Sequence, residues 1–213
     1  MEHPKALCWD PSYIYYTQQS YKTYFQTKII FADDTALIIK FSKTDKDKLA
    51  TLKEKLNYLL EHFTANKLKL NIGKTEILTN FATGEIKLGT DTIPVHGKTH
   101  TVKYLGVNIN TALDWQTHID SIRNKCRFGL VQMYRLKQGD PSIRNLLFNS
   151  LIKSYITYGL SAWGPSVTKK QFDTINTLIK SGLRCVAGIN RKSHTGKYMK
   201  QYGQLRVTFE LIL

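Results

Sequence analysis

Two adjacent aspartates, Asp33 and Asp34, are the residues in this sequence best suited to chemistry. They interrupt an apolar stretch, with residues 29–31 before them and residues 36–39 after them. Mg²⁺ prefers carboxylate oxygens, and phosphoryl transfer with two divalent ions needs such oxygens held in place. The alternative interpretation is an ordinary acidic turn, in which Asp is a favoured residue. The pair is therefore a candidate Mg²⁺ or Mn²⁺ site, and the surrounding sequence decides between a metal site and an ordinary acidic turn.

The cysteines and histidines do not predict a second metal site. Cys8, Cys126 and Cys185 are widely spaced and contain no Cys-x-x-Cys pair, which argues against a zinc site and against a disulfide framework. His100 and His118 have no second His or Cys at ligand spacing on a predicted face. We therefore expect free cysteines in a reducing compartment and no metal at these histidines.

The residues around the aspartates predict a β-hairpin over 28–40 with an acidic tip. Leucines then recur at helical spacing over 45–66, where Thr44 is the expected N-cap and Asp47 follows three residues later. Further elements are expected as a turn at Asn71, Gly73 and Lys74, a strand over 76–81, a small hairpin over 85–95 and a strand over 102–109. The hairpin would place Asp33 and Asp34 at its turn, where loops commonly carry function.

Beyond about residue 111 the apolar residues follow a helical period. One helix is predicted over 114–137, and a second begins at Asp140 as N-cap with Pro141 in the first position. This second helix extends to about Ser161 and is apolar on more than one side, so we expect it to lie between other helices. A third helix is predicted over 168–187.

The net charge of +15 points to a polyanionic partner. Residues 1–100 hold 14 Lys and Arg against 11 Asp and Glu, whereas residues 101–213 hold 17 against 5, a net charge of +12. The alternative is simple solubility through surface lysines. Trp115 and Trp163 lie on apolar stripes and are expected to be core anchors instead of base-stacking platforms. The candidate phosphate contacts are Arg123, Arg127, Lys169, Lys170, Lys180 and Arg184.

Five segments together resemble one protein family. Phe31-Ala-Asp-Asp-Thr-Ala-Leu-Ile38 resembles the Tyr/Phe-Ala-Asp-Asp signature of reverse transcriptases, and its Thr-Ala-Leu-Ile tail is similar to the non-LTR retrotransposon (LINE-like) branch. The other four segments follow in the order of that family: Leu68-Lys-Leu-Asn-Ile-Gly-Lys-Thr-Glu-Ile-Leu78, Val102-Lys-Tyr-Leu-Gly-Val107, Asp114-Trp-Gln-Thr-His-Ile119 and Tyr155-Ile-Thr-Tyr-Gly-Leu-Ser-Ala-Trp-Gly164. The resemblance covers about residues 28 to 190.

The resemblance implies an α+β fold, with an irregular lead-in over 1–27, a partial polymerase palm over 28–110 and a basic, all-α thumb over 111–213. The palm would combine the hairpin with a small antiparallel sheet and a packed helix. The implied activity is RNA-directed DNA polymerisation with Mg²⁺ or Mn²⁺, on an RNA template with a DNA primer or on an RNA–DNA hybrid. The family works on chromosomal targets, so a nuclear location is implied by analogy. No stretch approaches the roughly 18 apolar residues of a membrane span, so no membrane partner is expected.

The resemblance also assigns roles to individual residues. Asp33 and Asp34 would be metal ligands, and Lys74 would donate a proton to the departing pyrophosphate, although it could equally be a solvated turn lysine. Tyr104, Leu105 and Gly106 match the block that supports the primer end. Gly106 allows close backbone approach, whereas Tyr104 and Leu105 could also be core residues.

One catalytic carboxylate of the family has no counterpart in the sequence. The family's palm takes a third carboxylate from an earlier strand, and Asp10, in Cys8-Trp-Asp-Pro-Ser, does not resemble that block. The fingers also have no counterpart, so we expect weak Mg²⁺ binding and no polymerisation by the chain alone. Three interpretations stay open: a polymerase fragment active only beside its missing half, a non-catalytic nucleic-acid-binding protein, or a structural partner of another reverse-transcriptase chain.

Overall fold

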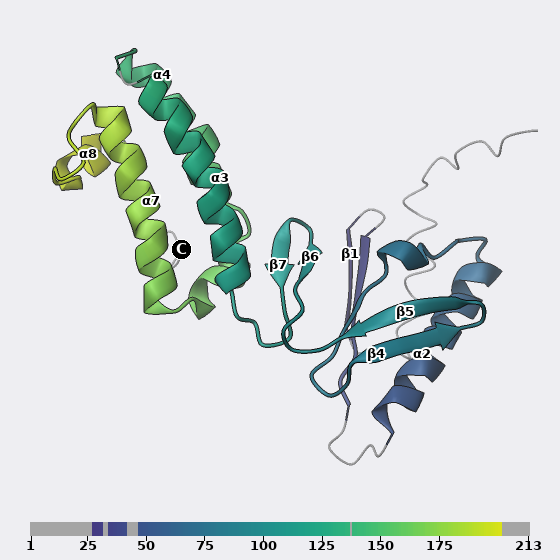
Figure 1. The fold of residues 1–213 in the computed structure, drawn as a ribbon. Helices are drawn as coiled ribbons and strands as arrows, with labels where there is room; N and C mark the ends of the chain where they lie inside the picture. Colours follow the sequence, from purple (N-terminus) through teal and green to yellow (C-terminus); the bar gives the residue numbers. More distant parts are fainter. Residues whose placement is uncertain (1–26, 32–33, 42–46, 137, 202–213) are drawn as a thin grey trace, which may run out of the picture. The chain divides into compact units, whose positions relative to one another are not determined.

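The computed structural model describes residues 27–31, 34–41, 47–136 and 138–201, with the backbone alone for residues 27–30. The chain divides into two compact units, an N-terminal unit over residues 1–97 and a C-terminal unit over 98–213. The first combines strands with one long helix, and the second is mainly helical (Figure 1). This mixture agrees with the α+β class expected from the sequence. No helix in the described ranges is long and apolar enough to cross a membrane.

The N-terminal unit begins with the predicted hairpin. Strands β1 (Thr27–Phe31) and β2 (Asp34–Ile38) pair in antiparallel fashion, and Phe31 opposite Asp34 is the pair nearest the turn. A short apolar run on each side of an acidic pair is typical of a β-hairpin. The hairpin prediction over residues 28–40 is therefore confirmed. Thr27, which was expected to end the irregular lead-in over 1–27, is the first residue of β1, and residues 1–26 lie outside the described residues.

The long helix of this unit is α2 (Lys48–Ala65), and its N-cap is Asp47. The Asp47 carboxylate accepts a 2.9 Å hydrogen bond from the backbone N–H of Ala50, which satisfies one of the helix's unpaired first-turn donors. The sequence had predicted a helix beginning at residue 45 behind Thr44, so this part of the prediction is wrong, and Thr44 itself lies outside the described residues. Asp47 precedes Ala50 by three residues, the spacing at which an N-cap side chain reaches a first-turn backbone N–H.

Three strands form the small sheet: β3 (Ile77–Leu78), β4 (Gly84–Leu88) and β5 (Asp91–His96), in the order β3-β5-β4. The pair β4 and β5 is the predicted hairpin, but β3 is shorter than expected and runs parallel to β5. A 3₁₀ turn, η1 (Ile72–Lys74), precedes β3 and confirms the predicted turn. The parallel pair sets Ile77 beside Val95 and Leu78 beside His96.

One apolar face of α2 covers this sheet. Leu52 and Leu56 are buried with four strand residues that recur at every second position: Ile86, Leu88, Ile93 and Val95. Every second residue of the strands is buried, and the buried residues of α2 recur at the helical period of 3.6. The apolar face of the sheet and the apolar face of α2 therefore share one core. Leu59 extends the same helix face onto Leu37 and Ile39 at the end of the first hairpin.

The C-terminal unit opens with a second hairpin, β6 (Val102–Tyr104) paired antiparallel with β7 (Val107–Ile109). The sequence had predicted one strand over 102–109, which is wrong. Leu105 and Gly106 adopt positive φ angles of 45° and 81°, and two such residues in succession reverse the chain. Val107 and Ile109 pack against the helical core, so this hairpin belongs with the helices and not with the palm-like part that was expected to end at residue 110.

The helices of the C-terminal unit follow in this order: α3 (Gln116–Arg135), α4 (Pro141–Phe148), a π-helical segment η2 (Asn149–Lys153), α5 (Ser154–Thr157), α6 (Leu160–Trp163), the 3₁₀ turn η3 (Gly164–Ser166), α7 (Lys169–Ala187) and α8 (Gly196–Gln201). The predicted N-cap Asp140 is confirmed, because its carboxylate accepts a 2.7 Å hydrogen bond from the backbone N–H of Ser142. Thr168 and Gln171 form a reciprocal capping box at the start of α7. Helices α3 and α7 pack side by side (Figure 1).

The second predicted helix differs from the expectation in two ways. Its apolar residues do not all lie inside, because Ile143 and Leu146 are 54% and 65% exposed while Phe148, Ile152 and Ile156 are buried. It also contains the π segment η2, and its regular part ends at Thr157. An extra residue in one turn rotates the buried face, which a period counted from sequence does not anticipate.

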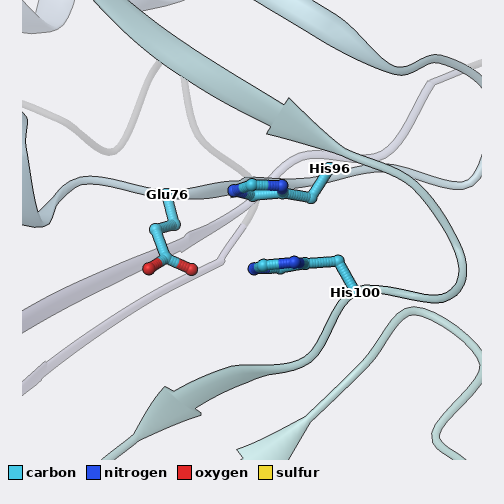
Figure 2. A group of neighbouring side chains, drawn as sticks. All are labelled: Glu76, His96 and His100. Atoms are coloured by element: carbon cyan, nitrogen blue, oxygen red, sulfur yellow. The ribbon is translucent and has the colours of Figure 1, made fainter.

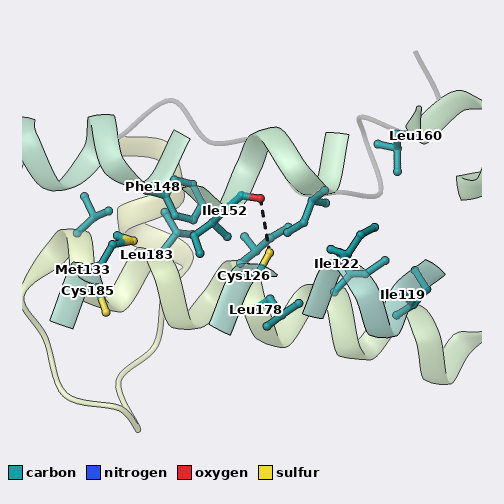
Figure 3. Close-up of a cluster of buried hydrophobic side chains, with 14 of the residues drawn as sticks. Ile119, Ile122, Cys126, Met133, Phe148, Ile152, Leu160, Leu178, Leu183 and Cys185 are labelled. Carbon is teal, nitrogen blue, oxygen red and sulfur yellow. Dashed lines mark hydrogen bonds between the residues drawn. The ribbon is translucent and has the colours of Figure 1, made fainter. Parts of the chain in front are cut away.

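The core of the C-terminal unit lies where α3, α7 and the α4-to-α5 helix meet. Buried Cys126 and Met133 of α3 face Phe148 and Ile152, with Leu178 and Leu183 of α7 beside them (Figure 3). The Cys126 thiol donates a weak 3.8 Å hydrogen bond to the Ile152 carbonyl oxygen. Close helix contact needs a glycine here, because a Cβ on Gly129 would lie 2.8 Å from the Leu151 backbone oxygen.

Candidate functional site

The predicted catalytic pair is described in part. Asp34 is the first residue of β2, next to the turn, and its side chain is exposed. Asp33 lies outside the described residues. The surface hollow on α2 is lined by Asn57, Leu60 and Glu61 among others, and Asp34 does not contribute to it. The structure therefore supplies an exposed carboxylate at a hairpin turn, and the metal site expected there stays a prediction.

Lys74 is the last residue of the 3₁₀ turn η1 and is exposed. Its backbone N–H is bound to the Asn71 carbonyl oxygen at 3.1 Å, so the turn is held while the ammonium group faces solvent. This position suits both interpretations that the sequence left open, a proton donor and a solvated turn lysine.

The segment Tyr104 to Gly106 forms the tip of the β6–β7 hairpin. Tyr104 and Leu105 are half-buried and Gly106 is exposed. The Tyr158 hydroxyl donates a 2.7 Å hydrogen bond to the Leu105 carbonyl oxygen, and a Cβ on Gly106 would lie 3.2 Å from the Tyr158 ring. Two of the five segments that resemble the polymerase family, one ending at Val107 and one containing Tyr158, are thus in direct contact within the C-terminal unit.

The six predicted phosphate contacts fall into two groups. Arg127, Lys169, Lys170 and Lys180 are exposed, with the lysines on α7 and the arginine on α3. Arg123 is half-exposed and forms a 2.9 Å ion pair with Asp120, and the Nε of Arg184 donates to the Ser193 carbonyl oxygen at 3.0 Å. The four exposed cations are the better placed for phosphate, since Arg123 and Arg184 already hold partners inside the unit.

The tryptophan prediction is confirmed, because Trp115 and Trp163 are 5% and 0% exposed. The His118 ring lies edge-on to Trp163 with 5.4 Å between centroids, and its Nδ1 accepts a 3.4 Å hydrogen bond from the Asn108 backbone N–H. Burial, with a smaller effect of the Lys125 charge, lowers the pKa of His118 from its ordinary value of 6.5. His118 is therefore a neutral core histidine that joins β7 to α3.

Three residues of the described chain form a group that could hold a metal ion: Glu76, His96 and His100. One ligand atom from each lies within 4.8 Å of the others, and Figure 2 shows the two imidazole rings one above the other with the carboxylate beside them. The sequence interpretation rejected a metal at His100 because it found no second His or Cys at ligand spacing, and it thereby overlooked His96. The spacing His96-x-x-x-His100 was the available signal. Glu76 is distant in sequence and is brought close by the pairing of β3 with β5.

Comparison of the chain with protein-family models, with curated protein sequences and with solved structures gives no significant match.

Proposed function

We propose that this chain is part of a reverse transcriptase of the non-LTR retrotransposon type, carrying the Asp-Asp hairpin of the palm and a basic helical thumb, and that it does not polymerise DNA alone. The observation that carries the proposal is the hairpin Thr27–Ile38, which has Asp34 exposed beside its turn. A polymerase palm of this kind needs carboxylates at such a turn. The five sequence segments in family order give the proposal its second support.

The candidate site residues of this chain supply only some of the groups that the polymerase reaction needs. Asp34, with its neighbour Asp33, would offer carboxylate oxygens to a Mg²⁺ ion, and such an ion would stabilise negative charge on the transferring phosphate. Two neighbouring carboxylates leave most coordination positions to water, so binding should be weak. In-line attack needs two ions held about 3.5–4 Å apart, and the third carboxylate that helps to hold them has no match in this sequence. Positioning of the incoming nucleotide, worth roughly 7 to 11 kcal/mol of a barrier, also has no counterpart.

Primer extension tests the first half of the proposal. The purified chain is given an RNA template, a DNA primer, four nucleotides and either Mg²⁺ or Mn²⁺, with the Asp33→Asn, Asp34→Asn double variant as control. We expect no extension by either protein. Extension by the unmodified chain that the variant abolishes would mean that the site is complete without the expected third carboxylate.

A chimera tests the second half. Residues 28–201 replace the corresponding part of an active non-LTR reverse transcriptase, and the same double substitution provides the control. We expect the chimera to extend a primer and the substituted chimera to bind the template and primer without extending. A folded chimera that binds nucleic acid and never extends would contradict a polymerase role for the hairpin.

The alternative function is non-catalytic nucleic-acid binding, and the charge distribution favours it specifically. The net charge of +12 over residues 101–213 and the exposed Arg127, Lys169, Lys170 and Lys180 suit a phosphate backbone without any need for Asp34. A gel-shift titration with RNA–DNA hybrid, read together with primer extension by the chimera, separates the two functions, because only the extension result differs between them. In the alternative, binding is unaffected when Asp33 and Asp34 are both replaced by Asn, and the chimera does not extend.

A further inference from the structure

We propose that Glu76, His96 and His100 form a binding site for a divalent transition-metal ion of the zinc class. The site is chemically separate from the Mg²⁺ site expected at Asp33 and Asp34, and it does not depend on the polymerase proposal. Two imidazole nitrogens and one carboxylate oxygen are a ligand set typical of Zn²⁺ sites that keep a fourth position for water. Mg²⁺, which prefers oxygen ligands in an octahedral arrangement, is a poor match for them.

Strand pairing places Glu76 and His96 on one face of the small sheet. Ile77 pairs with Val95, which is buried in the core of the N-terminal unit, and both therefore face α2. Side chains alternate along a strand, so Glu76 and His96, each next to one of these residues, point to the opposite face. The Thr79 backbone N–H donates a 2.9 Å hydrogen bond to the His96 carbonyl oxygen, which extends this pairing and holds the backbone at the end of β5.

His100 joins the group through a local reversal of the chain. It follows His96 by four residues, in the short segment that leaves β5 through Gly97. This segment turns the second imidazole back over the first, as Figure 2 shows. The closeness of the two rings therefore follows from a few residues of chain directly after β5.

The distances suit a metal after small side-chain movements. The three ligand atoms lie within 4.8 Å of one another. Bonds of about 2.0–2.1 Å in a tetrahedral site place ligand atoms about 3.3 Å apart. Glu76 is exposed and both histidines are half-buried, so rotation of the carboxylate and of His100 can close the difference while His96 stays at the end of its strand. Half-burial also leaves a path for the ion to enter.

Metal titration of the full-length, tag-free chain tests the site. Chain stripped with a chelator and desalted is titrated with Zn²⁺ in a calorimeter, with and without a large excess of Mg²⁺. We expect one Zn²⁺ site that Mg²⁺ does not displace. Removal of groups that merely support metal ligands costs about 10–100-fold in affinity, so His96→Ala, His100→Ala and Glu76→Gln should each weaken binding by at least ~10-fold. His194→Ala, at an exposed histidine in the C-terminal unit, is the matched control and should leave affinity unchanged.

Cobalt provides a second readout that depends on geometry. Co²⁺ bound to this set should give the visible absorption of a four-coordinate ion with nitrogen and oxygen ligands, and Glu76→Gln should remove or shift it. Glu76 is exposed, so this variant keeps the fold, which circular dichroism verifies. Absence of Zn²⁺ binding, displacement of Zn²⁺ by Mg²⁺, or binding that survives replacement of all three residues would each overturn the proposal.

Discussion

The hydroxyl of Tyr158 donates a 2.7 Å hydrogen bond to the carbonyl oxygen of Leu105, and this bond ties the tip of the β6–β7 hairpin to the helices of the C-terminal unit. The two residues are 53 positions apart in the chain. Trp163 strengthens the same connection, because its Nε1–H donates a 3.0 Å hydrogen bond to the Tyr158 carbonyl oxygen. The chain reversal at Leu105 and Gly106 is thus supported from the helical side.

Tyr158→Phe should lower the free energy of unfolding of the C-terminal unit by about 0.5–1.5 kcal/mol, because it removes one hydrogen bond and keeps the ring. Urea unfolding followed by tryptophan fluorescence measures the change, since Trp115 and Trp163 are both buried in this unit. Tyr155→Phe is the matched control, because the Tyr155 ring lies under Lys125 at 5.2 Å and this contact survives the loss of the hydroxyl. An equal loss in both variants would mean that the bond to Leu105 contributes nothing.

Gly129→Ala should destabilise the C-terminal unit by about 1–3 kcal/mol through overpacking, despite the better helix propensity of alanine. The new Cβ would lie 2.8 Å from the Leu151 backbone oxygen, and backbone cannot move aside as a flexible side chain can. Gly196→Ala is the control, because nothing lies within 4 Å of a Cβ there. Thermal unfolding of both variants checks this, and a Gly129→Ala protein as stable as the control would contradict the packing of α3 on η2.

Acid should weaken the C-terminal unit through His118. Its folded-state pKa is lowered from 6.5, so the unfolded chain binds the proton more readily. Stability from this group is therefore complete above about pH 6.5 and decreases as the pH falls below it. Urea midpoints at several pH values should fall less steeply with acid in His118→Gln than in the unmodified chain. His194→Gln, at an exposed position, should keep the original slope; an unchanged slope in His118→Gln would count against the assignment.

Cys126 should resist alkylation in the folded chain. Burial raises the pKa of its thiol to about 12 from 9.0, and the thiolate is the reactive form. The same shift makes the folded state lose stability as the pH rises above about 9, where the unfolded chain releases the proton first. Iodoacetamide labelling followed by peptide mass spectrometry should find Cys126 unmodified in buffer and modified in urea. Rapid labelling in buffer would show that the thiol is accessible.

Nucleic-acid binding should depend on salt through the exposed cations of the C-terminal unit. If about five phosphates are neutralised, log affinity falls with log salt at a slope on the order of −4 to −5. Replacement of Arg127, Lys169, Lys170 and Lys180 by Gln should make the slope less steep by about 3 to 4 and weaken binding on every sequence alike.

The matched control for this charge change replaces four exposed lysines of the N-terminal unit by Gln: Lys40, Lys53, Lys69 and Lys87. Fluorescence anisotropy with a labelled RNA–DNA hybrid, repeated across a range of salt concentrations, measures both slopes. If both sets of substitutions weaken binding and reduce the salt slope equally, net charge would determine the affinity and the four exposed cations of the C-terminal unit would have no special role.

Local features of the sequence were sufficient for much of the fold. The alternation around Asp33 and Asp34 predicted the first hairpin, and helical spacing predicted α3 and α7 with their buried stripes. Asp140 before Pro141 predicted where α4 begins. These features depend on neighbours within a few residues, because caps, turns and amphipathic periods are local properties of a chain. The α+β class implied by the family resemblance agrees with these local features.

The remaining features were decided by contacts between distant residues. Val102 to Ile109 reads as one strand, and the turn at Leu105 is stabilised by Tyr158, which no local pattern indicates. Ile143 and Leu146 are exposed while Phe148 is buried in the core, and a π segment follows directly after Phe148. Glu76 lies close to His96 because β3 pairs parallel with β5. Local periodicity specifies which face of an element is apolar, but the partner of that face, and the polar groups gathered on the other, depend on how the elements pack.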